Sequence, residues 1–131
     1  MFEEDTMLET IEKMLEEKEY LALRSTLTEL QEADVAALFG ELPADDLPLM
    51  FRILPKEMAA ECFSYMDSEV QQTLLEGFSD QELETVLDGL YVDDTVDLME
   101  EMPANVVHRI IEKVPPDKRD KINMILRYPK N

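Results

Sequence analysis

The sequence contains little that would build a disulfide-bonded, β-rich or membrane-spanning protein. Its single cysteine, Cys62, cannot form an internal disulfide, which favours a reducing compartment such as the cytosol. Three glycines leave few positions for the positive φ angles of β-hairpins. The longest uninterrupted apolar runs, such as 35–39, are five residues long, far short of the roughly 20 that span a bilayer. We therefore expect a helical chain with no signal peptide and no membrane span.

Basic residues are also scarce. Twelve Lys and Arg oppose 31 Asp and Glu, so the formal net charge is −19. The cationic stretches near Lys118, Arg119 and Lys121 are short and are interrupted by Asp120, so no basic patch is available to bind phosphate. This excludes nucleic acid and an anionic membrane surface as partners, whereas cations or a basic protein suit such a surface. Solubility is the simpler reason for the same charge.

Recognisable catalytic motifs are missing as well. The sequence has no Gly-rich phosphate loop and no G-x-S-x-G elbow. His108 has neither a second His nor a Cys at zinc-ligand spacing, which predicts an ordinary helix residue. Cys62 lies beside Phe63 and near Met58 and Met66, which favours a small core residue over a nucleophile. We therefore do not expect an enzyme.

What the sequence does contain is a repeat of about twelve residues. Ten-residue strings, from DVAALFGELP to KRDKINMILR, begin at positions 34, 46, 57, 69, 82, 94, 105 and 118. In the first string, Val35, Leu38, Phe39 and Leu42 fall at i, i+3, i+4 and i+7, which is one face of a helix. Helices this short are unstable alone, so burial against neighbours must hold them together. The repeat predicts an all-α, solenoid-like stack of short helices.

Acidic residues and prolines mark the predicted helix boundaries. Acidic or amide residues at the starts suit the free N–H groups and the helix dipole, and prolines at the ends cannot continue a helix. The starts carry Asp34, Asp46, Asp94 and Asn105, and the ends carry Pro43, Pro55, Pro103, Pro115 and Pro129. The apolar patterns predict one domain, with a pair of capping helices in 1–31 and a repeat body in 32–131.

The densest cluster of oxygen ligands lies in the segment 92–101. Asp93 and Asp97 are at i and i+4, so both carboxylates can face one way and share a hard cation such as Mg²⁺. Two carboxylates hold such an ion only loosely, because Mg²⁺ keeps most of its water and demands six oxygens. A second surface is therefore expected to complete the site. The alternative interpretation is that the aspartates cap the start of a helix.

Three longer strings resemble a known family. ALFGELPADDLPLMFRILPKEMAAECFSYM, LYVDDTVDLMEEMP and INMILRYP are similar to the N-terminal cytosolic domain of MgtE-type magnesium transporters. The resemblance covers nearly the whole chain and implies a right-handed superhelix of about ten short helices, on the cytoplasmic side of the cell membrane. In that family, the step that matches Tyr128 and Pro129 leads into two cystathionine-β-synthase-type (CBS) domains and then the membrane pore. The chain is therefore expected to end just before these domains, and the full-length protein to be a homodimer.

The resemblance also implies a role in sensing Mg²⁺. In the family, Mg²⁺ ions bridge acidic residues of this domain and of the CBS domains, which compacts the assembly and closes the pore. By position in the D-D-x-x-D string, the implied ligands are Asp93 and Asp97, with Asp94 between them, and the A-A-E string adds Glu61. Because the partner acids lie on the CBS domains, Mg²⁺ binding by this domain alone is expected to be weak.

Two alternative functions fit the same helical pattern. Similar short-helix repeats occur in flagellar motor switch proteins, where they stack on identical neighbours as structural modules. A free-standing scaffold could also bind a peptide on a concave helical surface, as many solenoids do. The Tyr128-Pro129 step and the D-D-x-x-D string favour the transporter domain over both.

Overall fold

The fold is entirely helical in the residues that the structure describes. This computed structural model describes the backbone of residues 3–127 and the side chains of residues 7–125. Within that range the chain forms ten α-helices, one short 3₁₀ helix, η1 (Ala44–Asp46), and no strand. The α-helices are α1 (Glu3–Glu16), α2 (Tyr20–Thr28), α3 (Glu32–Glu41), α4 (Leu47–Ile53), α5 (Lys56–Ser64), α6 (Ser68–Gly77), α7 (Asp80–Gly89), α8 (Val92–Glu100), α9 (Ala104–Lys113) and α10 (Pro116–Arg127). The predicted all-α fold of about ten short helices is confirmed.

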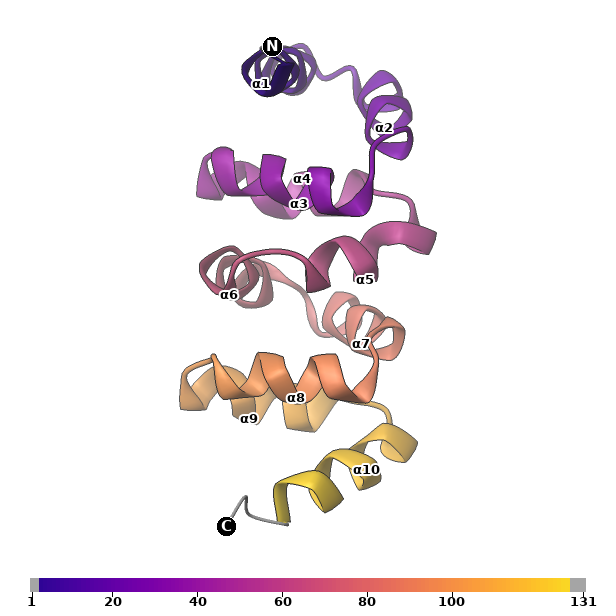
Figure 1. The fold of residues 1–131 in the computed structure, drawn as a ribbon, viewed down its shortest axis with the longest axis vertical. Coiled ribbons are helices and arrows are strands. Elements are labelled where there is room, and N and C mark those ends of the chain that lie inside the picture. Colours follow the sequence, from indigo (N-terminus) through magenta and orange to yellow (C-terminus); the bar gives the residue numbers. More distant parts are fainter. Residues whose placement is uncertain (1–2, 128–131) are drawn as a thin grey trace.

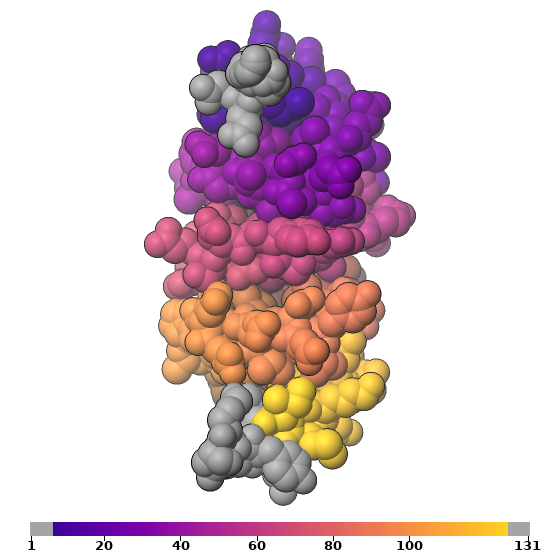
Figure 2. All heavy atoms as spheres, viewed as in Figure 1, coloured from indigo at the N-terminus to yellow at the C-terminus, as the bar shows by residue number. Residues whose placement is uncertain are grey.

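The helices are stacked in layers along the long axis of the molecule, from α1 at one end to α10 at the other (Figure 1). Beyond α1, many helices pack on the helix two positions further along the chain. These pairs are α2 with α4, α3 with α5, α4 with α6, α5 with α7, α7 with α9, and α8 with α10. The space-filling view shows the same order as successive bands of colour (Figure 2). This arrangement is the solenoid-like superhelix that the repeat predicts.

The structural repeat is twelve residues long. Helical segments begin at residues 20, 32, 44, 56, 68, 80, 92, 104 and 116, where η1 opens the segment at 44. The strings identified in the sequence begin one or two residues later, because they follow acidic and apolar residues of the first turn. α2 begins twelve residues before α3 and therefore shares the register of the repeat body.

Three columns of equivalent repeat positions form the core. The first column contains Leu27, Phe39, Phe51, Phe63, Leu75, Leu87 and Met99, all buried. The second contains Leu38, Met50, Cys62, Leu74, Val86, Leu98, Ile110 and Ile122, all buried. The third lies at or just after the helix ends and contains Leu42, Leu54, Met66, Phe78, Leu90, Met102 and Val114. Each such side chain contributes roughly 1.5–3 kcal/mol by its burial, which stabilises helices too short to persist alone.

Aromatic rings link neighbouring layers of this core. Phe51 contacts three other rings, with centroid distances of 6.4 Å to Phe39, 6.1 Å to Phe63 and 5.0 Å to Phe78. The contacts with Phe39 and Phe63 are edge-to-face, a geometry worth about 0.5–1.5 kcal/mol beyond the area buried. Phe51 therefore joins α3, α4, α5 and the end of α6 into one unit.

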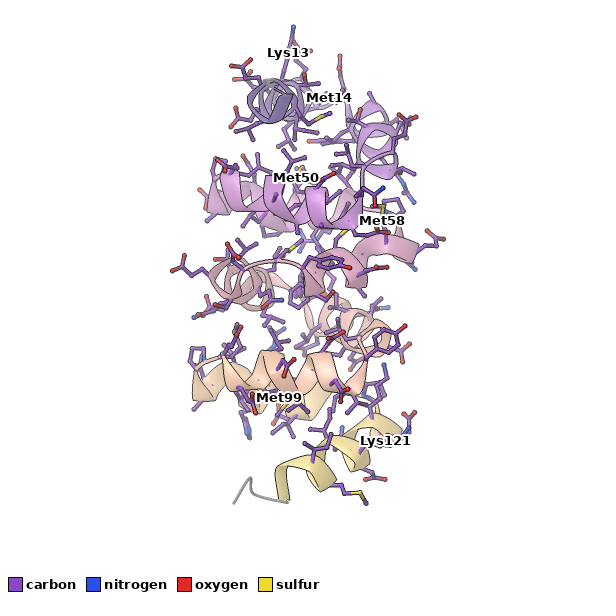
Figure 3. All side chains as sticks on the ribbon, viewed as in Figure 1. Lys13, Met14, Met50, Met58, Met99 and Lys121 are labelled. Atoms are coloured by element: carbon purple, nitrogen blue, oxygen red, sulfur yellow. The ribbon has the colours of Figure 1, made fainter. Side chains whose placement is uncertain are left out.

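Most of the methionines in the described residues are buried in the core. Met50, Met58 and Met99 are buried between helix layers (Figure 3), whereas Lys121 on α10 is exposed. Met124 on α10 is the exception, with 61% of its surface exposed. Their flexible side chains fill the irregular gaps between short helices that cross at different angles.

The helix ends do not use glycine caps. Within the described residues no glycine has a positive φ, and Lys18 is the one non-glycine residue that does. Extended residues end α3, α4, α6, α7 and α9, and a proline then often begins the next segment. Pro43, Pro55 and Pro103 are N-caps of the following segments, and Pro115 directly precedes α10. These four confirm the predicted boundaries, whereas Tyr128 and Pro129 lie outside the described residues.

Candidate functional site

Helix α8 carries the acidic residues that the sequence singles out. Asp93 and Asp97 are both exposed and lie one helical turn apart, so they share one face of α8. Asp94 is half-buried. The opposite side of the helix is buried through Thr95, Val96, Leu98 and Met99. Packing therefore fixes the rotation of α8 and leaves the Asp93 and Asp97 carboxylates facing outward.

The aspartates do not occupy the N-cap of α8. That position belongs to Tyr91, which makes no side-chain capping bond, and Asp93 and Asp94 are in the first turn. The Thr95 hydroxyl donates to the carbonyl oxygen of Tyr91 at 3.2 Å, which keeps this buried polar side chain satisfied. Neither Asp93 nor Asp94 therefore caps α8 through a side-chain hydrogen bond. Favourable interaction with the positive end of the helix dipole remains.

The four candidate carboxylates have no cationic partner among the described side chains. Asp93, Asp94, Asp97 and Glu61 make no side-chain hydrogen bond or ion pair in residues 7–125. By contrast, Glu82 and Asp80 are each paired with an arginine. On a chain of net charge −19, unpaired exposed carboxylates favour the approach of a cation.

Glu61 lies on a different helix from the α8 aspartates. It is exposed on α5, next to Ala60, which packs against Gly89 at the end of α7. Across the described residues, no group of three or more His, Cys, Asp or Glu side chains is arranged to hold a metal ion. The structure brings Asp93 and Asp97 onto one face and does not gather Glu61 with them into one cluster. The carboxylate oxygens of Asp93 and Asp97 suit Mg²⁺, and an ion held by these two residues alone would keep most of its bound water.

The turn that leads into α8 is held by a lysine that the sequence does not reveal as functional. Lys118 on α10 donates to the carbonyl oxygens of Leu87 at 3.2 Å and Leu90 at 2.7 Å, and also to that of Asp88. These carbonyls lie at or just after the end of α7, where a helix leaves its last carbonyls without a full set of partners, and that of Leu87 also accepts the Leu90 amide at 3.3 Å. A cation there also suits the negative end of the helix dipole.

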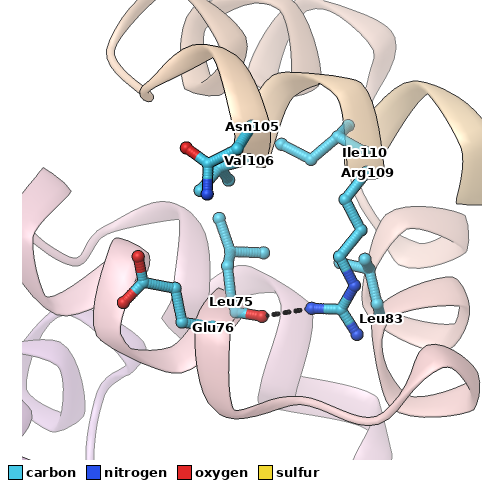
Figure 4. A pocket seen from close by; sticks show the side chains of 7 residues that line it. All are labelled: Leu75, Glu76, Leu83, Asn105, Val106, Arg109 and Ile110. Atoms are coloured by element: carbon cyan, nitrogen blue, oxygen red, sulfur yellow. Dashed lines mark hydrogen bonds between the residues drawn. The ribbon is translucent and has the colours of Figure 1, made fainter.

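An arginine makes equivalent contacts one repeat earlier, at the turn between α6 and α7. Arg109 on α9 donates to the carbonyl oxygens of Leu75 at 2.6 Å and Phe78 at 2.7 Å, at the end of α6. It also donates to Asp80 at 3.1 Å, and together with Lys113 it lowers the pKa of that carboxyl. Figure 4 shows Arg109 reaching the Leu75 carbonyl beside a small cavity of about 210 Å³ between α6, α7 and α9.

A sequence signal for these cations exists in the helical pattern. Arg109 shares a face with Val106, Ile110 and Lys113, and Lys118 is four residues before the buried Ile122. A basic residue on an otherwise apolar stripe indicates that its head group finds oxygens inside the structure. The partners themselves, about 30 residues away, follow only from the way the helices stack.

The two other candidate reactive side chains match their predicted roles. Cys62 is fully buried, and burial, followed by the nearby Glu32 and Glu61 charges, raises the pKa of its thiol to about 12. His108 is exposed on α9 and lies 3.1 Å from Glu112 one turn along. Neither arrangement activates a nucleophile at neutral pH.

Comparisons with known proteins agree with the helical architecture. The family described as the MgtE intracellular N domain matches residues 30–131, well over half of the chain. No curated protein matches the sequence. In the described part of the chain, no helix is both long enough and apolar enough to cross a bilayer.

Solved structures that are similar to this one include two from magnesium transport proteins. The cytosolic domain of the Mg²⁺ channel MgtE in complex with ATP is 27% identical with a TM-score of 0.79, and the match covers 95% of this chain and 51% of that one. The soluble part of a magnesium transporter is 15% identical with a TM-score of 0.83, and the match covers 98% of this chain and 51% of that one, which supports the fold alone. This chain thus spans about half the length of either. With this fold and a family match over most of its residues, the chain belongs to the MgtE intracellular N domain family.

Proposed function

We propose that this chain is the cytosolic regulatory domain of a Mg²⁺ transporter or channel. In this proposal Mg²⁺ bridges its acidic residues to CBS domains of the same protein and thereby favours the closed pore. Membership of the MgtE family supports the transporter context, which is not that of an enzyme. The same match favours this function over a flagellar motor switch module or a peptide-binding scaffold.

The observation that carries the proposal is the outward pair Asp93 and Asp97 on α8. Both carboxylates are exposed and without a partner among the described side chains, and they project from a helix whose other face is firmly packed. Glu61 on α5 offers a further exposed carboxylate, and Asp94 is the less accessible member of the set. Such oxygens attract Mg²⁺ without enclosing it, so a second acidic surface must supply the remaining ligands.

The mechanism follows from electrostatics. Two acidic surfaces repel each other at short range, and monovalent salt only weakens that repulsion. A divalent ion bound between the two surfaces turns this net repulsion into a net attraction. Because the ion finds its full ligand set only when the surfaces are docked, it binds the docked state more tightly and shifts the population toward it. At low Mg²⁺ the surfaces separate, and the full-length homodimer returns to its open state.

The test is a Mg²⁺ titration of a protein that joins this domain to its CBS domains, with protection of the connecting segment from protease as the readout. Asp93→Asn combined with Asp97→Asn should raise the Mg²⁺ midpoint of protection by about tenfold or more. Glu12→Gln with Glu16→Gln is the matched control, because it removes two exposed carboxylates at the same spacing on α1. If both double variants had the same Mg²⁺ midpoint of protection, the effect would come from net charge alone, and the site assignment would be wrong.

A further inference from the structure

The turn between α7 and α8 is short, and the backbone hydrogen bond beside it runs from the Leu90 amide to the Leu87 carbonyl at 3.3 Å. Only Leu90 and Tyr91 separate the last residue of α7, Gly89, from the first residue of α8, Val92. Leu90 is extended, and Tyr91 offers no side-chain capping bond. The direction in which α8 leaves this turn therefore depends on contacts from elsewhere in the molecule.

Lys118 supplies such a contact. Its ammonium group has three N–H donors, and the structure pairs them with the carbonyl oxygens of Leu87, Asp88 and Leu90. Leu90 immediately precedes Tyr91, whose carbonyl accepts the first helical bond of α8 from the Thr95 amide at 3.0 Å. α10 itself packs directly against α8. One side chain thus ties α10 to the point where α8 begins.

The Lys118 charge is committed to these carbonyls. With all three donors used, the ammonium group makes no ion pair with Asp93, Asp94 or Asp97. A lysine paired with the aspartates would compete with a bound cation for their oxygens. A lysine that binds backbone carbonyls instead leaves the aspartates available and limits the movement of the helix that carries them.

We propose that Lys118 is a positioning residue for the Asp93–Asp97 pair, and that its tie to the α7–α8 turn sets how tightly this pair takes Mg²⁺. This inference rests on the proposed function. A cation shared by two carboxylates one turn apart needs both at a fixed separation, and α8 begins only one residue before Asp93. If the start of α8 loosens, the pair loses its preorganised geometry and the ion loses affinity.

Charge and geometry predict opposite results for Lys118→Met. Loss of one positive charge makes the chain more acidic, so electrostatics alone predicts tighter Mg²⁺ binding. Loss of positioning predicts weaker binding. We expect the apparent Mg²⁺ dissociation constant to rise by about threefold or more, as for the removal of a group that orients a metal ligand.

Arg109→Met is the matched control. It also removes one positive charge and the hydrogen bonds from a later helix, α9, to a helix end, but at the α6–α7 turn, one repeat before the α7–α8 turn. Both variants should lower the free energy of unfolding. Only Lys118→Met should weaken Mg²⁺ binding, and Lys118→Arg, which keeps charged N–H donors in place, should restore most of it.

The measurement is a MgCl₂ titration, at constant ionic strength, of a protein that joins this domain to its CBS domains, followed by NMR through the backbone amides of Asp93 and Asp97. Circular dichroism in the helical region checks that each variant is folded at the temperature used. If Lys118→Met does not fold, Lys118→Gln, which keeps two N–H donors, takes its place in the titration. No Mg²⁺-dependent shift at α8 in the unaltered protein would remove the proposed function itself. If the unaltered protein shows the Mg²⁺-dependent NMR shift at α8 but the Lys118 variant has an unchanged or lower dissociation constant, only the positioning role of Lys118 is contradicted.

Discussion

Gly89 and Ala60 bring α7 and α5 into direct contact. A Cβ atom placed on Gly89 would lie 2.9 Å from the Cβ of Ala60, closer than side chains approach each other. The absence of a side chain at Gly89 thus sets the spacing of these two helices immediately before the turn into α8. Its backbone has no positive φ, so packing and not conformation requires glycine here.

Gly89→Ala should therefore destabilise the protein. The added methyl group forces α5 and α7 apart, at an expected cost of about 1–3 kcal/mol in the free energy of unfolding. Ala60→Gly in the same chain should recover some of that loss, because the two positions are directly coupled. Urea denaturation of the single and double variants measures both effects.

Gly40→Ala is the control for that substitution. No atom lies within 4 Å of a Cβ placed on Gly40, which is exposed in α3. Alanine there should stabilise the protein by roughly 0.5 kcal/mol through its higher helix propensity. A loss of stability at Gly40 as large as at Gly89 would contradict the packing argument.

Glu82 joins α7 to the end of α4. It accepts a hydrogen bond from Arg52 Nη2 at 3.0 Å and another from Arg52 Nε, and it completes a capping box with Ser79. The Arg52 hydrogen bond is the main cause that lowers the Glu82 pKa to about 2 from an ordinary 4.5. The stabilisation is therefore fully present above about pH 4.5 and is lost as the pH falls through about 2.

Glu82→Gln should cost stability at neutral pH and little in acid. Glutamine can still serve the capping box, so the loss reflects the partly exposed ion pair and should be about 1 kcal/mol. The difference in unfolding free energy between wild type and Glu82→Gln, measured by urea denaturation at a series of pH values, should shrink below pH 4.5. Glu84→Gln, at an exposed neighbour on α7, is the matched control, because it removes one carboxylate from the same helix without breaking the pair with Arg52. A constant difference for Glu82→Gln would contradict the pairing.

Cys62 should be unreactive in the folded protein. Its thiol is fully buried and its pKa is raised to about 12, so almost no thiolate is available at about pH 8. Labelling with a thiol-specific disulfide reagent should proceed only as fast as the protein unfolds, and should become rapid in denaturant. Fast labelling under native conditions would show that the core opens around α5.

Much of the fold is predictable because the repeat places apolar residues at fixed intervals. The face formed by Val35, Leu38, Phe39 and Leu42 is buried as expected, and Pro43 marks a boundary. The start of each helix is predicted less well. Acidic residues are expected as caps, but here prolines and Tyr91 hold several of those positions while the acids enter the first turn.

The candidate site is predictable only to a limited extent. The shared face of Asp93 and Asp97 follows from helical geometry, which depends on residues four apart. The ties from Arg109 and Lys118 depend on residues about 30 apart, and no local rule states which helix lies opposite which turn. The position of Glu61 relative to α8 is likewise a property of the stack, and its role as a ligand stays a prediction.

Small-angle scattering of the cytosolic region of the protein, with this domain joined to its CBS domains, tests the central claim most directly. With Mg²⁺ present, divalent ions at Asp93 and Asp97 should hold the acidic surfaces together, and the radius of gyration should be smaller than after chelation. The Asp93→Asn and Asp97→Asn double variant should stay extended at the same Mg²⁺ concentration. A radius of gyration that does not depend on Mg²⁺ would contradict the account.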